Sequence, residues 1–97
     1  MITLGGKIFL EGFEELAPAE VLVVKKLVGS YVREACQYED RCSSVRLVLS
    51  KKEQEFSLWV GAFVGDAETV HTEVQGKNIF MTLDRALKSL LRSLANK

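Results

Sequence analysis

The sequence predicts an α+β fold: a β-α-β-β-β-α two-layer sandwich in which two helices pack on one face of one four-stranded sheet. Two segments, one in the first third of the chain and one at its end, place apolar residues at the three- and four-residue spacing of an amphipathic helix. Between them, three segments alternate apolar and polar residues, which is the period of strands covered on one face. The chain has 97 residues, enough for one small core, so we expect a single domain over residues 1–97.

The first strand and the first helix occupy the first third of the chain. Ile2 to Leu10 is predicted as one strand, with Gly5-Gly6 marking a bulge or a twist within it. Pro18 suits a first helical turn, because the N–H that proline lacks would have no partner there. We expect this helix from Ala19 to about Cys36, stabilised mainly by packing, because valine is a poor helix former. Its inward stripe consists of Val21, Val24, Val28, Val32 and Ala35.

Three strands and a second helix follow. Ser44 to Ser50 and Phe56 to Phe63 are predicted strands, joined by a hairpin connection at Lys51–Gln54. A last strand follows the turn at Gly65-Asp66, and Asn78 is expected to cap the final helix. The inward residues of the last strand are Val70, Thr72 and Val74, and those of the final helix are Ile79, Leu83, Leu87, Leu90 and Leu94.

The composition excludes several classes of protein. Hydrophobic residues make up 47% of the chain and charged residues 27%, as in globular proteins and unlike disordered ones. No apolar run is long enough to cross a bilayer and the N-terminus lacks a secretion signal, so we expect a cytoplasmic protein without a membrane partner. Cys36 and Cys42 are expected to be free thiols, because Cys-x5-Cys with a single histidine is not a zinc pattern. No metal or cofactor is expected.

Charge is separated along the chain, although the net charge is zero. Residues 77–97 contain five basic residues and one acid, whereas the chain outside residues 18–36 and 77–97 contains five basic and ten acidic residues. A strongly basic segment of this kind indicates a negatively charged partner, which the net charge of zero does not reveal.

The basic residues of the last helix are predicted to lie on one face. Arg85, Lys88 and Arg92 are spaced i, i+3 and i+7, opposite the leucine stripe, and Lys97 extends the row. The first helix also turns three basic residues away from its valine stripe: Lys25, Lys26 and Arg33. Side by side, the helices would form a positive ridge or groove suited to a sugar–phosphate backbone. The alternative, to which the spacing gives about equal weight, is that these are ordinary solvated helix faces.

The Gly76-Lys77-Asn78 sequence resembles the end of a phosphate-binding loop. The run of glycines that should precede it and the Ser or Thr that should follow the lysine are both missing. We therefore interpret it as a turn followed by a helix cap.

Trp59 and Phe63 have the strand parity opposite to the inward residues, so they are predicted on the sheet face that the helices leave open. Packing against neighbours is the first interpretation of these aromatic side chains. Burial in a homodimer or another protein interface is the second, and stacking of nucleic-acid bases is the third.

Catalytic residues are not indicated by any spacing in the chain. His71 is the only histidine, it is predicted in mid-strand, and neither Cys36 nor Cys42 is placed beside it by the sequence. An enzyme that uses one of the cysteines is the last alternative, and we expect the protein not to be an enzyme.

The stretch VHTEVQGKNIFMTLDRALKSLLRSL, from Val70 to Leu94, resembles the ribosome hibernation-promoting factor family, the short ribosome-associated inhibitors of stationary phase. Members similarly run an alternating strand through glycine into a helix with an aspartate one turn in and a basic end. The residues that fit this pattern are His71, Gly76, Asp84, Leu90, Arg92 and Leu94. ITLGGKIFL and the lysine-bearing first helix match more weakly, so the resemblance covers the topology of most of the chain but the residues of only its last third.

The resemblance implies a β-α-β-β-β-α fold with both helices on one sheet face. It also implies binding to the small ribosomal subunit, with basic helix residues contacting rRNA in the channel of mRNA and tRNA and blocking translation under stress. Arg92 matches the family pattern best, and Lys88, Arg85, Lys25 and Lys26 are the further candidates.

Overall fold

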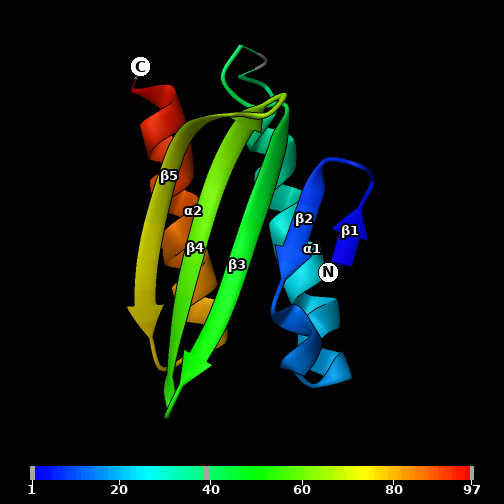
Figure 1. Ribbon diagram of the computed structural model, residues 1–97, viewed down its shortest axis with the longest axis vertical. Helices are drawn as coiled ribbons and strands as arrows, with labels where there is room; N and C mark the ends of the chain where they lie inside the picture. The colour runs from blue at the N-terminus through cyan, green and yellow to red at the C-terminus, as the bar shows by residue number, and fades with distance from the viewer. Residues whose placement is uncertain (1, 39, 97) are drawn as a thin grey trace.

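The computed structural model describes residues 2–38 and 40–96 of the chain (Figure 1). These described residues form five strands, two α-helices and one short 3-10 helix. In chain order they are β1 (Ile2–Leu4), β2 (Ile8–Glu11), η1 (Phe13–Glu15), α1 (Pro18–Ala35), β3 (Ser44–Lys52), β4 (Glu55–Val64), β5 (Ala67–Gly76) and α2 (Ile79–Ala95).

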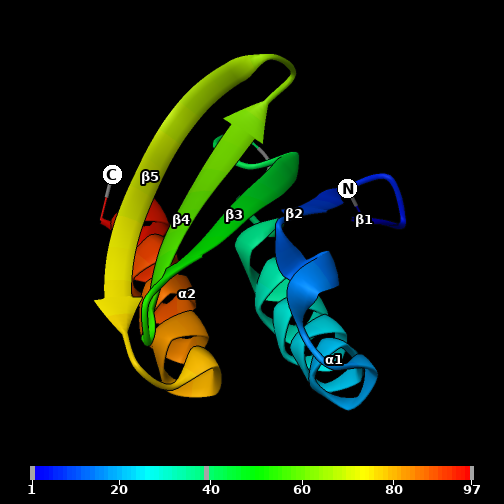
Figure 2. The same ribbon diagram turned by 60° about the horizontal axis from the view of Figure 1, so that its bottom comes forward.

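All five strands form one mixed sheet in the order β1-β2-β3-β4-β5. The β2–β3 pair is parallel, as a crossover through α1 requires, and the other pairs are antiparallel. Both helices lie on the same face of the sheet and run in roughly the same direction, whereas the opposite face carries no helix (Figures 1 and 2). The predicted α+β class and two-layer arrangement are therefore confirmed.

The predicted number of strands was wrong, because the first predicted strand is a hairpin. Gly5 and Gly6 have φ of 58° and 73°, the left-handed values that the two central positions of a type I′ turn require. The Lys7 N–H donates to the Leu4 carbonyl at 3.2 Å, and Leu4 pairs with Ile8. Gly-Gly therefore reverses the chain, and the sheet gains a fifth strand at its edge.

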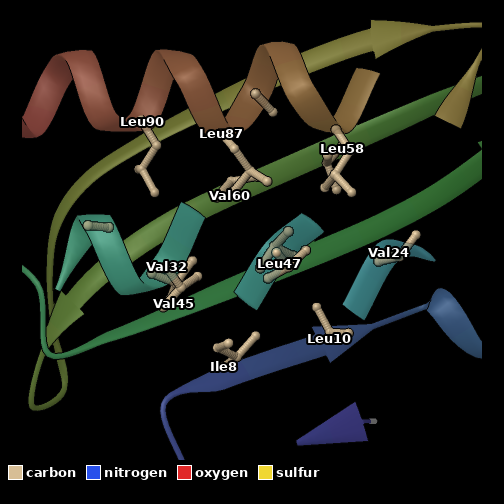
Figure 3. Close-up of a cluster of buried hydrophobic side chains, with 14 of the residues drawn as sticks. Ile8, Leu10, Val24, Val32, Val45, Leu47, Leu58, Val60, Leu87 and Leu90 are labelled. Atoms are coloured by element: carbon tan, nitrogen blue, oxygen red, sulfur yellow. The ribbon is translucent and has the colours of Figure 1, made fainter. Parts of the chain in front are cut away.

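The core lies between the helices and the sheet, as the two periodicities predict (Figure 3). Leucines of α2 pack over β4 and valines of α1 pack over β2 and β3. The largest side chains that are fully buried are Phe13, Leu10, Leu47, Leu58, Leu83, Leu87, Leu90, Leu94, Val24, Val28, Val45 and Val60. This packing fixes which faces of the two helices point to solvent.

The hairpin between β3 and β4 is tighter than predicted. Lys51 and Lys52 belong to β3, and Lys52 pairs with Glu55, so only Glu53 and Gln54 form the turn. Glu53 adopts a φ of 60°, which suits a two-residue hairpin turn.

Among the described residues, no helix is long and apolar enough to cross a membrane.

Candidate nucleic-acid interface

The basic row of α2 consists of Arg85, Lys88 and Arg92, and all three side chains are exposed. Burial of the leucine stripe on the sheet turns this row outward. In the part of the chain that the structure describes, Lys88 is the only member of the row in an ion pair, with Asp84 at 3.0 Å. Arg85 and Arg92 keep their guanidinium groups available to a phosphate, which they can hold through two parallel hydrogen bonds.

Arg33 of α1 does not lie on the flank of that helix that faces α2. Tyr31 marks the flank of α1 that faces α2, because its hydroxyl bonds to an α2 side chain. At 3.6 residues per turn, Arg33 lies on nearly the opposite side of the helix. Arg33 in fact lines a depression of about 600 Å³ together with Leu4 and Lys7 of the first hairpin. On the same helix Lys26 is exposed and Lys25 is half-buried.

Between the two basic groups lies a polar link from α1 to α2. The Tyr31 hydroxyl donates to Asp84 Oδ1 at 2.5 Å, and Lys88 Nζ lies 3.0 Å from Asp84 Oδ2. The hydrogen bond from Tyr31, and then that from Lys88, holds the pKa of Asp84 below its ordinary value, and the same bond to Asp84 raises the pKa of Tyr31 to about 12. Asp84 is therefore ionised at neutral pH and offsets part of the charge of Lys88.

Replacing Tyr31 with phenylalanine is expected to raise the pKa of Asp84 toward its ordinary value of 3.8, because the largest cause of its lowering is removed. A lowered carboxyl pKa stabilises the fold above the pKa of the unfolded chain, and this stabilisation is lost as the pH falls through the folded pKa. Tyr31→Phe should therefore lose less stability than the wild type between about pH 5 and pH 2.

Urea unfolding followed as a function of pH tests this expectation. Tyr38→Phe is the matched control, because Tyr38 is also a half-buried tyrosine, whereas the pKa of Asp84 is lowered by Tyr31 and Lys88. An acid dependence that is identical in Tyr31→Phe and the wild type would show that the hydrogen bond has no part in the ionisation of Asp84.

Gly76 ends β5, the chain bends at Lys77 and Asn78 caps α2, which agrees with the predicted turn and cap. The Asn78 side chain accepts hydrogen bonds from the N–H groups of Phe80 and Met81 at 2.9 and 3.1 Å. These are the donors that a phosphate at the start of α2 would need. Gly76 serves packing, since a Cβ there would lie 2.4 Å from the hydroxyl of the buried Thr82.

The open face of the sheet carries Trp59 and Phe63, whose ring centroids are 6.2 Å apart. The distal end of the Trp59 indole lies over Gly61, where a Cβ would be 2.3 Å from the ring. His71, beside Gly61 on β5, stacks on the indole at 5.8 Å. Gly61 therefore makes room for a tryptophan that lies along the sheet, and both aromatic side chains remain half-buried without a helix above them.

Arg46 and Phe9 extend this aromatic surface across the sheet, and sequence reasoning missed their contact. The Arg46 guanidinium carbon lies 5.9 Å from the centre of the Phe9 ring, and the two residues are paired between β2 and β3. The two residues become neighbours only through the parallel pairing of β2 with β3, which no local pattern in the sequence shows.

The cysteines and His71 do not come together. Cys42 packs in the core between the sheet and the helices, whereas His71 lies on the opposite face of the sheet, paired with Glu68 at 2.7 Å. Burial raises the pKa of the Cys42 thiol to about 12, so it is protonated at neutral pH. The structure thus gives no support to a Cys–His catalytic pair.

Lys97, which the sequence adds to the basic row of α2, lies outside the described residues.

No model of a protein family matches this sequence, and no curated protein matches it either. Among solved structures, the chain is similar to a ribosomal subunit interface protein from Coxiella burnetii, with a TM-score of 0.65 and 12% sequence identity. The similarity covers 93% of this chain and 92% of that one. The structural similarity thus extends over nearly the whole chain, whereas the resemblance in sequence is carried by its last third. We conclude that this protein has the fold of a ribosomal subunit interface protein.

Proposed function

We propose that this protein is a non-catalytic ribosome-binding factor that contacts rRNA of the small subunit through its helix face and blocks translation by occlusion under stress. Two observations support the proposal: the fold is that of a ribosomal subunit interface protein, and the same fold presents a row of exposed basic residues. Such a factor would act in the cytoplasm and would need no cofactor.

The exposed basic row of α2 is the observation that carries the proposal. Its three residues lie along one face of a helix whose opposite face is buried in the core. Arg85 and Arg92 should contribute most, because Lys88 would have to exchange its bond with Asp84 for one with a phosphate. Lys26 and Arg33 of α1 would add contacts at the other side of the helix layer, so the proposed contact area is broad and is not a single groove between the helices.

Charge reversal of the row tests the proposal. The variant Arg85→Glu/Lys88→Glu/Arg92→Glu should bind small ribosomal subunits on the order of 100-fold more weakly than the wild type at about 0.1 M salt, because each lost phosphate contact forfeits the release of condensed counterions. Binding is measured by co-sedimentation with purified small subunits, and circular dichroism checks that the variant is folded.

The matched control is Arg46→Glu/Lys51→Glu/Lys52→Glu, which makes the same change in net charge at exposed positions on β3. It should retain most of the wild-type affinity. Equal losses in the two triple variants would mean that net charge, and not the α2 row, determines binding.

A second candidate function, a protein-interaction or dimerisation module, is favoured by the open sheet face. Trp59 and Phe63 stay half-buried there with no covering element, and such a surface is a common site of protein contacts. This candidate predicts a dimer that persists in the α2 charge reversal and dissociates in Trp59→Lys. Sedimentation equilibrium of the two variants distinguishes it from ribosome binding.

A further inference from the structure

Two thiols meet at the end of α1. Cys36 is the C-cap residue of the helix, and its N–H donates to the Val32 carbonyl. The chain then turns, and the N–H of Cys42 donates to the Tyr38 carbonyl at 2.8 Å. The end of the helix and the following turn bring the Sγ atoms of Cys36 and Cys42 within 3.9 Å of each other, although Cys42 is six positions after Cys36 in the sequence.

The two thiols differ in their access to solvent. Cys36 is half-buried and lines the depression beside Arg33, whereas Cys42 is 1% exposed and lies in the core. The Cys42 thiol is also 3.6 Å from the Ser44 carbonyl, which it can use as an acceptor. A reagent in solution can therefore reach the thiol of Cys36, whereas the thiol of Cys42 is buried behind it.

We propose that Cys36 and Cys42 form a dithiol site that a small disulfide, such as oxidised glutathione, converts to an intramolecular disulfide. The sulfur atoms need to approach by about 2 Å to reach bonding distance, which rotation about the two Cα–Cβ bonds and a small shift of the turn can supply. This inference is independent of the proposed ribosomal function.

The reaction proceeds in two exchange steps. The Cys36 thiolate attacks one sulfur of the small disulfide, forms a mixed disulfide and releases one small thiol. Cys42 then loses its proton to solvent, attacks Cys36 Sγ and expels the second small thiol. Two protein thiols and one small disulfide thus become one protein disulfide and two small thiols, and two electrons pass to the small disulfide. The second step is the slower one, because burial disfavours the Cys42 thiolate.

The disulfide would stiffen the connection that supports the end of α2. Between the cysteines lies Arg41, whose guanidinium donates to the Leu94 carbonyl in the last turn of α2 at 2.5 Å. The Arg41 carbonyl in turn accepts a hydrogen bond from the Thr69 hydroxyl of β5. Fixing the turn through Cys36 and Cys42 should therefore slow amide hydrogen exchange in the last turn of α2 as well as in the turn itself.

The test treats the full chain with oxidised glutathione and reads the products by mass spectrometry without reduction. The expected product is a monomer lighter by two hydrogen atoms, with Cys36 and Cys42 in one cross-linked peptide and a melting temperature raised by about 4 °C or more. Cys42→Ala should stop at the mixed disulfide on Cys36, and Cys36→Ser should react only slowly.

Phenylarsine oxide, which bridges neighbouring thiols, provides a second reading that requires no oxidation. One equivalent should bind the wild type and none should bind tightly to Cys36→Ser, so the pair is tested even if Cys42→Ala folds poorly. Stable glutathione adducts on the wild type without ring closure, or disulfides between two chains, would overturn the proposal.

Discussion

Replacing Gly12 with alanine is expected to lower the free energy of unfolding by about 2–5 kcal/mol. The loss has two causes: alanine disfavours the left-handed backbone conformation of this residue, and its Cβ would overlap a neighbouring strand. Gly12 has a φ of 86° where the chain leaves β2 for η1. A Cβ at this position would lie 2.1 Å from the carbonyl oxygen of Leu49 in β3. The obstacle is backbone, so no change of rotamer can relieve the overlap, and β3 would have to move away from the end of β2.

Urea unfolding of Gly12→Ala measures the loss, and Gly65→Ala is the matched control. Gly65 has a similarly left-handed φ of 61°, but nothing lies within 4 Å of the place that its Cβ would take. The control should lose only the conformational part, about 1–2 kcal/mol. If the two variants were destabilised equally, the close approach of Gly12 to Leu49 would have no energetic weight.

Leu87→Ala is expected to destabilise the protein by about 2–5 kcal/mol, because it removes buried methyl groups and leaves a cavity between α2 and the sheet. Leu87 is 1% exposed and its side chain points toward Val60 on β4 (Figure 3). Since small domains are stable by only about 5–15 kcal/mol, the variant should be partly unfolded at modest urea concentrations.

The control for this variant is Leu22→Ala on α1, the same substitution in a helix at a side chain that is 62% exposed. Its unfolding free energy should stay within about 0.5 kcal/mol of the wild type. Thermal unfolding of both variants checks the comparison. A loss of stability at Leu22 as large as that at Leu87 would contradict the arrangement of the core.

The parts of the fold that rest on local periodicity could be predicted from the sequence. Both helices and the meander of three strands lie where their apolar spacing places them, and Asn78 caps α2 as expected. The first hairpin was missed because Gly5-Gly6 lies inside an alternating run, where glycine is compatible with a bulge as well as with a turn. Only the paired strands show which of the two the chain adopts.

The candidate site was predicted less completely, because the contacts around its residues join distant parts of the chain. Spacing within one helix was enough to assign Arg85, Lys88 and Arg92 to one exposed face. Tyr31 and Asp84 are 53 residues apart, so no local pattern could show that their bond links the helices or that Asp84 pairs with Lys88. The position of Arg33 beside the first hairpin likewise depends on that hairpin, which the sequence did not reveal.

The most direct test of the proposed function is the affinity of the protein for purified small ribosomal subunits as a function of salt concentration. Three phosphate contacts from the α2 row are expected to contribute between about −2 and −3 to the slope of the logarithm of the binding constant against the logarithm of the salt concentration. In the charge-reversed variant the slope should be shallower by about that amount, with only the contribution of Lys26 and Arg33 remaining. Absence of binding at about 50 mM salt, or binding that does not depend on salt, would contradict an rRNA contact through the helix face.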